Sequence, residues 1–137
     1  MTAKKLKVLV VEDNVNVQFL IQRFLQPIAW VETALDGEEG LEAFRRAINR
    51  EEPYDLLCID IMLPRMDGVE MLKQIRELEK EKGHLPGRGV KALMISALND
   101  PKSVMKSFSE LCHGYLIKPV AKQALYDKIR ELGFELD

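Results

Sequence analysis

The chain has 137 residues, of which 47% are hydrophobic and 31% charged, and its formal net charge is −2. This size and balance suit one globular domain, so residues 1–137 are expected to form a single unit without an output domain. Direct nucleic-acid binding is not expected because there is no basic excess, and the apolar runs are too short to cross a membrane. The two cysteines, Cys58 and Cys112, lack metal-site spacing, and no signal peptide is visible, so the expected location is cytoplasmic.

Five strand-like apolar runs alternate with five helical patterns along the chain. In chain order, the strands are predicted at Leu6–Val11, Ile28–Ala34, Tyr54–Ile59, Val90–Ile95 and Tyr115–Ile117. Apolar residues three or four positions apart predict helices over Val15–Gln26, around Leu41–Ile48, Val69–Leu78 and Val104–Leu111, and over Ala121–Leu132. This alternation is typical of βαβ units and predicts an α/β fold, with a parallel sheet covered by helices on both faces.

Polar side chains follow the ends of four predicted strands. Glu12 and Asp13 come after the first, Asp60 after the third, Ser96 after the fourth and Lys118 after the fifth. Ligands of open α/β sheets bind outside the carboxyl ends of the strands, so these groups are expected to meet at one rim. A single carboxylate after a strand is usually a helix cap, and Asp13 could be one. Three carboxylates and a lysine at the same rim are harder to explain in that way.

Such a rim has the parts needed for phosphoryl transfer. Neighbouring carboxylates raise one another's proton affinity, and a hard cation such as Mg²⁺ relieves their repulsion. A carboxylate can attack phosphorus to give an aspartyl-phosphate, while the metal and an ammonium group offset charge on the transferring group. A serine hydroxyl can donate a hydrogen bond to one of its oxygens.

Four segments together resemble the response-regulator receiver domain of two-component signalling. They are Val10–Asn14, Asp60–Gly68, Ser96-Ala97 and Tyr115–Pro119. Their order and spacing extend the resemblance over nearly the whole chain. It implies a flavodoxin-like, CheY-like fold, with five parallel strands in the order 2-1-3-4-5.

The resemblance also implies a role for each rim residue. Asp60 would accept the phosphoryl group from a sensor histidine kinase or a phosphotransfer protein. Mg²⁺ would be bound by Asp13, by Asp60 and by the backbone carbonyl of Met62, with Glu12 supporting the metal through water. Ser96 and Lys118, named above, would bind the phosphoryl oxygens.

A coupled movement of Ser96 and Tyr115 would then switch a protein-interaction surface. The resemblance places that surface on the fourth helix, fifth strand and fifth helix, where a downstream target protein or a second copy would bind. The Lys118–Pro119 bond is expected to be cis.

Two other functions fit the residues less well than the switch. A haloacid-dehalogenase-type phosphatase needs a second aspartate two residues after the nucleophile, where this chain has Met62, so the chain is not expected to be an enzyme. A flavodoxin-like FMN carrier would need a Ser/Thr/Gly-rich loop in place of Glu12–Asn14. A receiver retained only as a scaffold, and a receiver excised from a hybrid histidine kinase or a larger response regulator, both stay open.

A few conspicuous residues receive ordinary structural interpretations. Trp30 and Tyr54 are predicted to be packing residues, and His84 and His113 to be surface residues. The charged stretch Glu77–Lys82 is predicted to be the solvated end of a helix.

Overall fold

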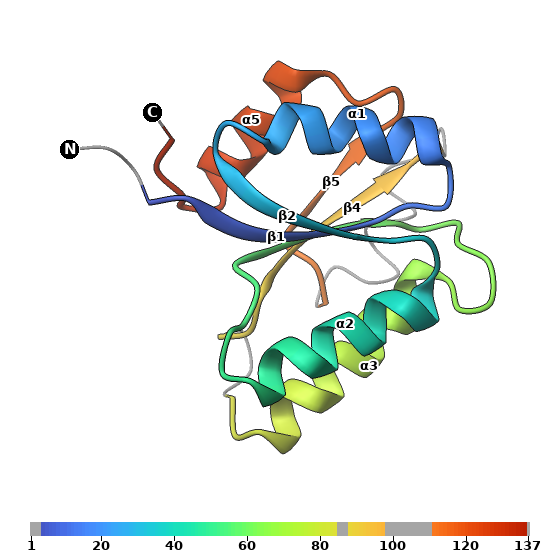
Figure 1. Ribbon diagram of the computed structural model, residues 1–137, viewed down its shortest axis with the longest axis vertical. Coiled ribbons are helices and arrows are strands. Elements are labelled where there is room, and N and C mark those ends of the chain that lie inside the picture. Colours follow the sequence, from blue (N-terminus) through green and yellow to red (C-terminus); the bar gives the residue numbers. More distant parts are fainter. Residues whose placement is uncertain (1–3, 85–87, 98–110, 137) are drawn as a thin grey trace.

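A parallel sheet with the strand order β2-β1-β3-β4-β5 organises the chain (Figure 1). This computed structural model describes residues 4–84, 88–97 and 111–136. The strands are β1 (Leu6–Val11), β2 (Ala29–Ala34), β3 (Leu56–Asp60), β4 (Lys91–Ser96) and β5 (Gly114–Ile117). The expected strand order and the parallel pairing are therefore confirmed.

Helices cover both faces of the sheet. They are α1 (Val15–Leu25), α2 (Gly37–Asn49), α3 (Gly68–Glu81) and α5 (Lys122–Glu131). Figure 1 shows α1 and α5 on one face, and α2 and α3 on the other. The predicted fourth helix, with Val104 and Phe108, lies outside the described residues. No helix in the described ranges is long and apolar enough to cross a membrane.

The core is divided by the sheet into two apolar clusters. Successive strand residues point to opposite faces, so Val8 and Val10 of β1 pack beneath α1 and α5, whereas Leu9 and Val11 pack against α2 and α3. All five residues of β3 are buried, as expected for a strand covered on both faces. Because β3 is the middle strand of the sheet, its end lies at the centre of the rim formed by the carboxyl ends of the strands.

Three helices begin with side-chain caps at that same rim. The Oδ1 atom of Asn14 accepts from the backbone N–H groups of the first turn of α1, at 3.0 and 3.1 Å. Asp36 and Asp67 accept in the same way at the starts of α2 and α3, each at 2.8 Å. Each cap contributes about 1 kcal/mol. Because the three helices begin at the rim, the positive ends of their dipoles lie there.

The start of α2 packs directly against the loop between β3 and α3. A Cβ atom added at Gly37 would lie 2.0 Å from the carbonyl oxygen of Met66. Arg65, in the same loop, has φ 66° and forms ion pairs with Asp36 at 3.6 Å and with Glu38 at 3.7 Å. Arg65 is 68% exposed in both ion pairs, so they contribute little compared with the backbone contact at Gly37.

The buried face of α3 is shifted from the predicted one. The structure buries Met71, Leu72, Ile75 and Glu79 and leaves Val69 and Leu78 only half-buried. The prediction that the stretch Glu77–Lys82 is solvated is therefore wrong at Glu79. Apolar residues occupy two adjacent stripes of this helix, and only the packing against α2 and the sheet selects between them.

Glu79 is buried because it belongs to a polar cluster that joins three segments. Its carboxylate accepts from Arg76 Nη1 and from the backbone N–H of Val90, both at 2.7 Å. Arg76 also donates from Nε and Nη2 to the carbonyl oxygen of Leu111, at 3.0 and 2.8 Å. The cluster thus links the end of α3 to the start of β4 and to the segment before β5.

Two single-residue expectations are corrected by the structure. Trp30 is not a packing residue, because it lies on the edge strand β2 and 65% of its surface is exposed. His113 is half-buried rather than on the surface, and its Nδ1 accepts from the N–H of Ala92 at 3.1 Å. Burial lowers the pKa of His113, and the charge of Lys91 acts in the same direction, which keeps this nitrogen available as an acceptor. Tyr54 is buried as predicted.

Candidate functional site

Asp60 is the last residue of β3 and is almost wholly buried. Its Oδ1 accepts from the backbone N–H of Met62 at 3.0 Å. Its Oδ2 accepts from Lys118 Nζ at 2.8 Å. One carboxylate is therefore held by a backbone donor from its own loop and by an ammonium group that follows β5.

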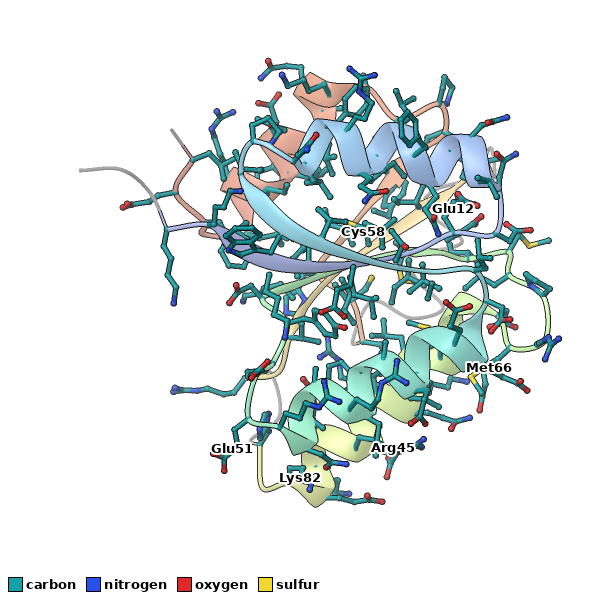
Figure 2. All side chains as sticks on the ribbon, viewed as in Figure 1. Glu12, Arg45, Glu51, Cys58, Met66 and Lys82 are labelled. Carbon is teal, nitrogen blue, oxygen red and sulfur yellow. The ribbon has the colours of Figure 1, made fainter. Side chains whose placement is uncertain are left out.

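Lys118 also reaches a second buried carboxylate, that of Glu12. Lys118 Nζ lies 2.6 Å from Glu12 Oε1, and the backbone N–H of Asn14 donates to Glu12 Oε2 at 3.0 Å. Glu12 directly follows β1, and Figure 2 shows it at the end of the sheet where α1 begins. The Lys118–Pro119 bond is cis, as expected. Residues from the ends of β1, β3 and β5 thus meet at one point.

The pKa values of this cluster reflect competition between burial and charge. Burial raises the pKa of Glu12 to about 7, with Asp60 adding to the rise and Lys118 and the Asn14 N–H opposing it. Burial alone would lower the pKa of Lys118, but its contacts with Asp60 and Glu12 outweigh that effect and raise it. The repulsion between carboxylates inferred from the sequence is therefore present, and Lys118 relieves part of it.

The three acidic residues at the rim suit a hard cation. Glu12, Asp13 and Asp60 each offer a carboxylate oxygen, and these atoms lie within 4.8 Å of one another. Glu12 Oε1 is buried and has no hydrogen-bond donor among the described residues, and its contact there is the ion pair with Lys118 Nζ at 2.6 Å. Carboxylate oxygens grouped in this way are suitable ligands for Mg²⁺ or for a metal-bound water. The metal role predicted for the carbonyl of Met62 stays a prediction.

Ser96 and Tyr115 lie on neighbouring strands beside the acidic cluster. Asp60 is paired with Ile95, so Ser96 stands one residue beyond it at the end of β4, where it is buried. Tyr115 is paired with Met94 on β5 and is partly buried against the cluster beneath α2 and α3. The predicted switch pair is therefore close in register, whereas its coupled movement stays a prediction.

One residue that supports the site was missed by the sequence analysis. Gln18, on α1, donates from Nε2 to the carbonyl oxygens of Glu12 at 3.2 Å and of Ala34 at 3.0 Å. It thereby ties the ends of β1 and β2 together beneath the acidic cluster. A Cβ atom added at Gly68 would lie 2.3 Å from the carbonyl oxygen of Asp60, so α3 can begin against the acceptor strand only with glycine there.

Comparison with known proteins agrees with this geometry. The sequence model of the response regulator receiver domain matches residues 8–130. The chain therefore belongs to the response regulator receiver domain family, which confirms the resemblance noted in the sequence.

The similar proteins include both a chemotaxis protein and a sensor histidine kinase. Chemotaxis protein CheY of Treponema pallidum is 30% identical over 125 residues, which are 90% of this chain and 79% of that protein. Sensor histidine kinase TmoS of Ectopseudomonas mendocina is 33% identical over 126 residues, covering 92% of this chain but only 12% of the kinase. The chain thus spans a small part of one relative and most of the other.

A solved complex shows the same fold. It is the co-crystal structure of the Saccharomyces cerevisiae histidine phosphotransfer protein Ypd1 with the receiver domain of its downstream response regulator Ssk1. The match has a TM-score of 0.79 and 33% identity, and it covers 97% of this chain and 92% of that chain.

Proposed function

We propose that this receiver domain is a phosphoacceptor switch in which Asp60 takes a phosphoryl group from a phosphohistidine with the help of Mg²⁺. The observation that carries the proposal is the convergence of three carboxylates and Lys118 Nζ at the end of the sheet, with Asp60 in contact with Lys118 at 2.8 Å. In the transfer, an Asp60 oxygen forms a bond to phosphorus while the phosphorus–nitrogen bond breaks and the imidazole leaves. The domain turns over no external substrate, so it is not an enzyme in its own right.

The residues around Asp60 have separate tasks in this proposal. Asp13 and Asp60 would hold the metal together with the carbonyl of Met62, and Glu12 would support it through water. Bound Mg²⁺ would supply positive charge to the phosphoryl oxygens. Lys118 also faces those oxygens, and its raised pKa keeps it protonated at neutral pH. The Ser96 hydroxyl donates a hydrogen bond to the same group.

The phosphodonor is proposed to be a sensor histidine kinase or a phosphotransfer protein, acting in the cytoplasm. The Ssk1 receiver domain, which this chain resembles over nearly its whole length, was crystallised with a phosphotransfer protein. The similarity to TmoS supports the alternative that the domain is part of a hybrid histidine kinase. Downstream, β5 and α5 form the described part of the proposed output surface, which binds either a target protein or a second copy.

Incubation with acetyl phosphate tests this function. With Mg²⁺, the wild-type chain should gain the mass of one phosphoryl group, and the bond should be labile to base, as acyl phosphates are. With excess EDTA the gain should disappear, because, among the described residues, Lys118 alone then offsets the charge of three carboxylates facing phosphate. Labelling that is equal with and without the metal would contradict the proposed site.

Ser96→Ala should separate phosphorylation from switching. The variant should still be phosphorylated at Asp60, but amide NMR shifts around Tyr115 should change much less than in the wild type. A new dianionic group gives the Ser96 hydroxyl an acceptor to move toward, and that movement shifts a pre-existing equilibrium. Ser96→Thr keeps the hydroxyl and is the matched control. If Ser96→Ala switches as fully as Ser96→Thr, the two side chains are not coupled.

A further inference from the structure

A groove of about 540 Å³ lies between α1 and the edge strand β2. Its walls include Phe19, Gln22 and Arg23 from α1, Gln26 at the C-terminal cap of that helix, Trp30 from β2, and Lys5. None of these residues has a part in the proposed phosphoryl transfer. We refer to this feature as the α1/β2 groove.

The α1/β2 groove presents two aromatic side chains to solvent. Trp30 is 65% exposed and Phe19 is 58% exposed, although large apolar side chains are usually covered. Each ring has a cation beside it, with Lys5 Nζ 4.0 Å from the centre of the Trp30 ring and the Arg23 guanidinium 5.9 Å from that of Phe19. The groove therefore combines apolar surface with positive charge.

Its charge differs in sign from that of the chain. Lys5 and Arg23 line the groove and no acidic residue does, whereas the whole chain has a net charge of −2. Gln22 and Gln26, one helical turn apart, each offer an amide donor and an amide acceptor, which is the pattern that a peptide backbone can satisfy. Beside them, β2 forms the edge of the described sheet and is paired there only with β1.

We propose that the α1/β2 groove binds an acidic peptide segment of a partner protein. An apolar side chain of the segment packs against Phe19 and Trp30, while its carboxylates pair with Lys5 and Arg23. Complementary charge of this kind speeds encounter and selects the partner, and buried aromatic residues supply most of the affinity. A nucleic acid fits less well, because two cations are few to neutralise a row of phosphates. Two cations are also few for an anionic membrane surface.

The groove is remote from Asp60 both along the strands and across the sheet. In the register, Leu6 pairs with Ala29 and Lys7 with Trp30, so the groove lies at the amino ends of the strands, whereas Asp60 lies at a carboxyl end. The edge strand β2 is also opposite to β5, which belongs to the proposed output surface. Peptide binding should therefore be independent of phosphorylation, and the groove would tether a partner whether or not the switch is on.

Selection from a displayed library of short random peptides tests this proposal. The wild-type chain is the bait, and the double variant Arg23→Glu/Trp30→Ala is used to remove peptides that bind elsewhere. The enriched peptides should be rich in Asp and Glu and should carry an aromatic or aliphatic residue. The only tryptophan of the chain is Trp30, so binding can be followed directly by its fluorescence.

Affinity measurements on an enriched peptide then locate the site. Arg23→Glu should weaken binding about tenfold or more, because it replaces attraction by repulsion. Lys73→Glu makes the same charge change at an exposed residue of α3, on the other face of the sheet, and should have little effect (Figure 1). Prior phosphorylation with acetyl phosphate should leave the affinity unchanged, so this result does not depend on the proposed function.

Several outcomes would overturn the proposal. They are a library without enrichment, enriched peptides that are neutral or basic, and an affinity that Arg23→Glu does not alter. Anionic phospholipid vesicles and a single-stranded oligonucleotide should be tested in parallel. If either one changes Trp30 fluorescence while no peptide does, the groove has a different kind of occupant and the proposal is wrong. The fold of each variant is checked by its amide NMR spectrum.

Discussion

Asp60→Asn should take up no phosphoryl group from acetyl phosphate, whereas Asp67→Asn should be labelled as fully as the wild type. The asparagine amide has nearly the same shape as the carboxylate but is not a nucleophile, so the acceptor is lost without a cavity. Asp67 lies in the same strand–loop–helix segment and caps α3 through Oδ1. Asparagine is an equally good cap, so the control changes a neighbouring carboxylate without disturbing the helix.

Intact-mass spectrometry measures both variants, and peptide mapping locates the phosphate in the wild type. If Asp60→Asn were labelled to the wild-type level, the acceptor would be another residue, such as the exposed Asp13. Loss of labelling in both variants would instead indicate a disturbed loop between β3 and α3. Circular dichroism and thermal melting of the two variants distinguish these cases.

Arg76→Leu should lower the free energy of unfolding by about 3 kcal/mol, since it leaves a buried carboxylate without its counter-charge. The side chains of Arg76 and Glu79 are only 19% and 5% exposed. The carbonyl oxygen of Leu111 also loses the two hydrogen bonds that Arg76 donates to it. Urea unfolding at neutral pH, with an unchanged slope, measures the difference.

Arg130→Leu is the matched control for that loss. Arg130 pairs with Asp127 at 3.5 Å, but these side chains are 45% and 56% exposed, so the expected change is below about 0.5 kcal/mol. The double variant Arg76→Leu/Glu79→Gln should regain part of the stability, because it removes the uncompensated charge and keeps an acceptor for the Val90 N–H. If it is no more stable than Arg76→Leu alone, the buried charge is not the cause.

The rim of the sheet could be predicted from the sequence because the relevant signals are local. Four of the five predicted strands are short apolar runs with a polar residue at or just after the end, and parallel strands bring all their carboxyl ends to one edge. Glu12, Asp60 and Lys118 could therefore be grouped from their positions in the sequence alone. The order of the strands could not be obtained in this way, since it depends on which apolar runs pair, and only the family resemblance implied it.

The features that were missed depend on contacts between distant segments. Nothing near Glu79 indicates burial, because its partner Val90 belongs to a loop beyond the end of α3. Gln18 looks like an ordinary exposed residue of a helix until its two carbonyl partners on different strands are known. The prediction for Trp30 was wrong because an aromatic residue in a strand is usually covered, and only the family resemblance, not the pattern around Trp30, places β2 at an edge.

The contacts at Gly37 and Gly68 limit which substitutions this domain can tolerate at these two positions. A Cβ atom at Gly37, at the start of α2, would lie 2.0 Å from the carbonyl oxygen of Met66. A Cβ atom at Gly68, at the start of α3, would lie 2.3 Å from the carbonyl oxygen of Asp60. A flexible side chain could rotate away from an added methyl group, but a carbonyl oxygen moves only if its strand or loop moves. Alanine at either position, which a single-nucleotide change can introduce, would therefore displace the backbone and destabilise the domain. Mutations that shift the first turn of α2 will also move the loop after Asp60, because Gly37 lies against the Met66 carbonyl in that loop. Such mutations would change the surroundings of the Asp60 carboxylate, although no residue of α2 touches it among the contacts described.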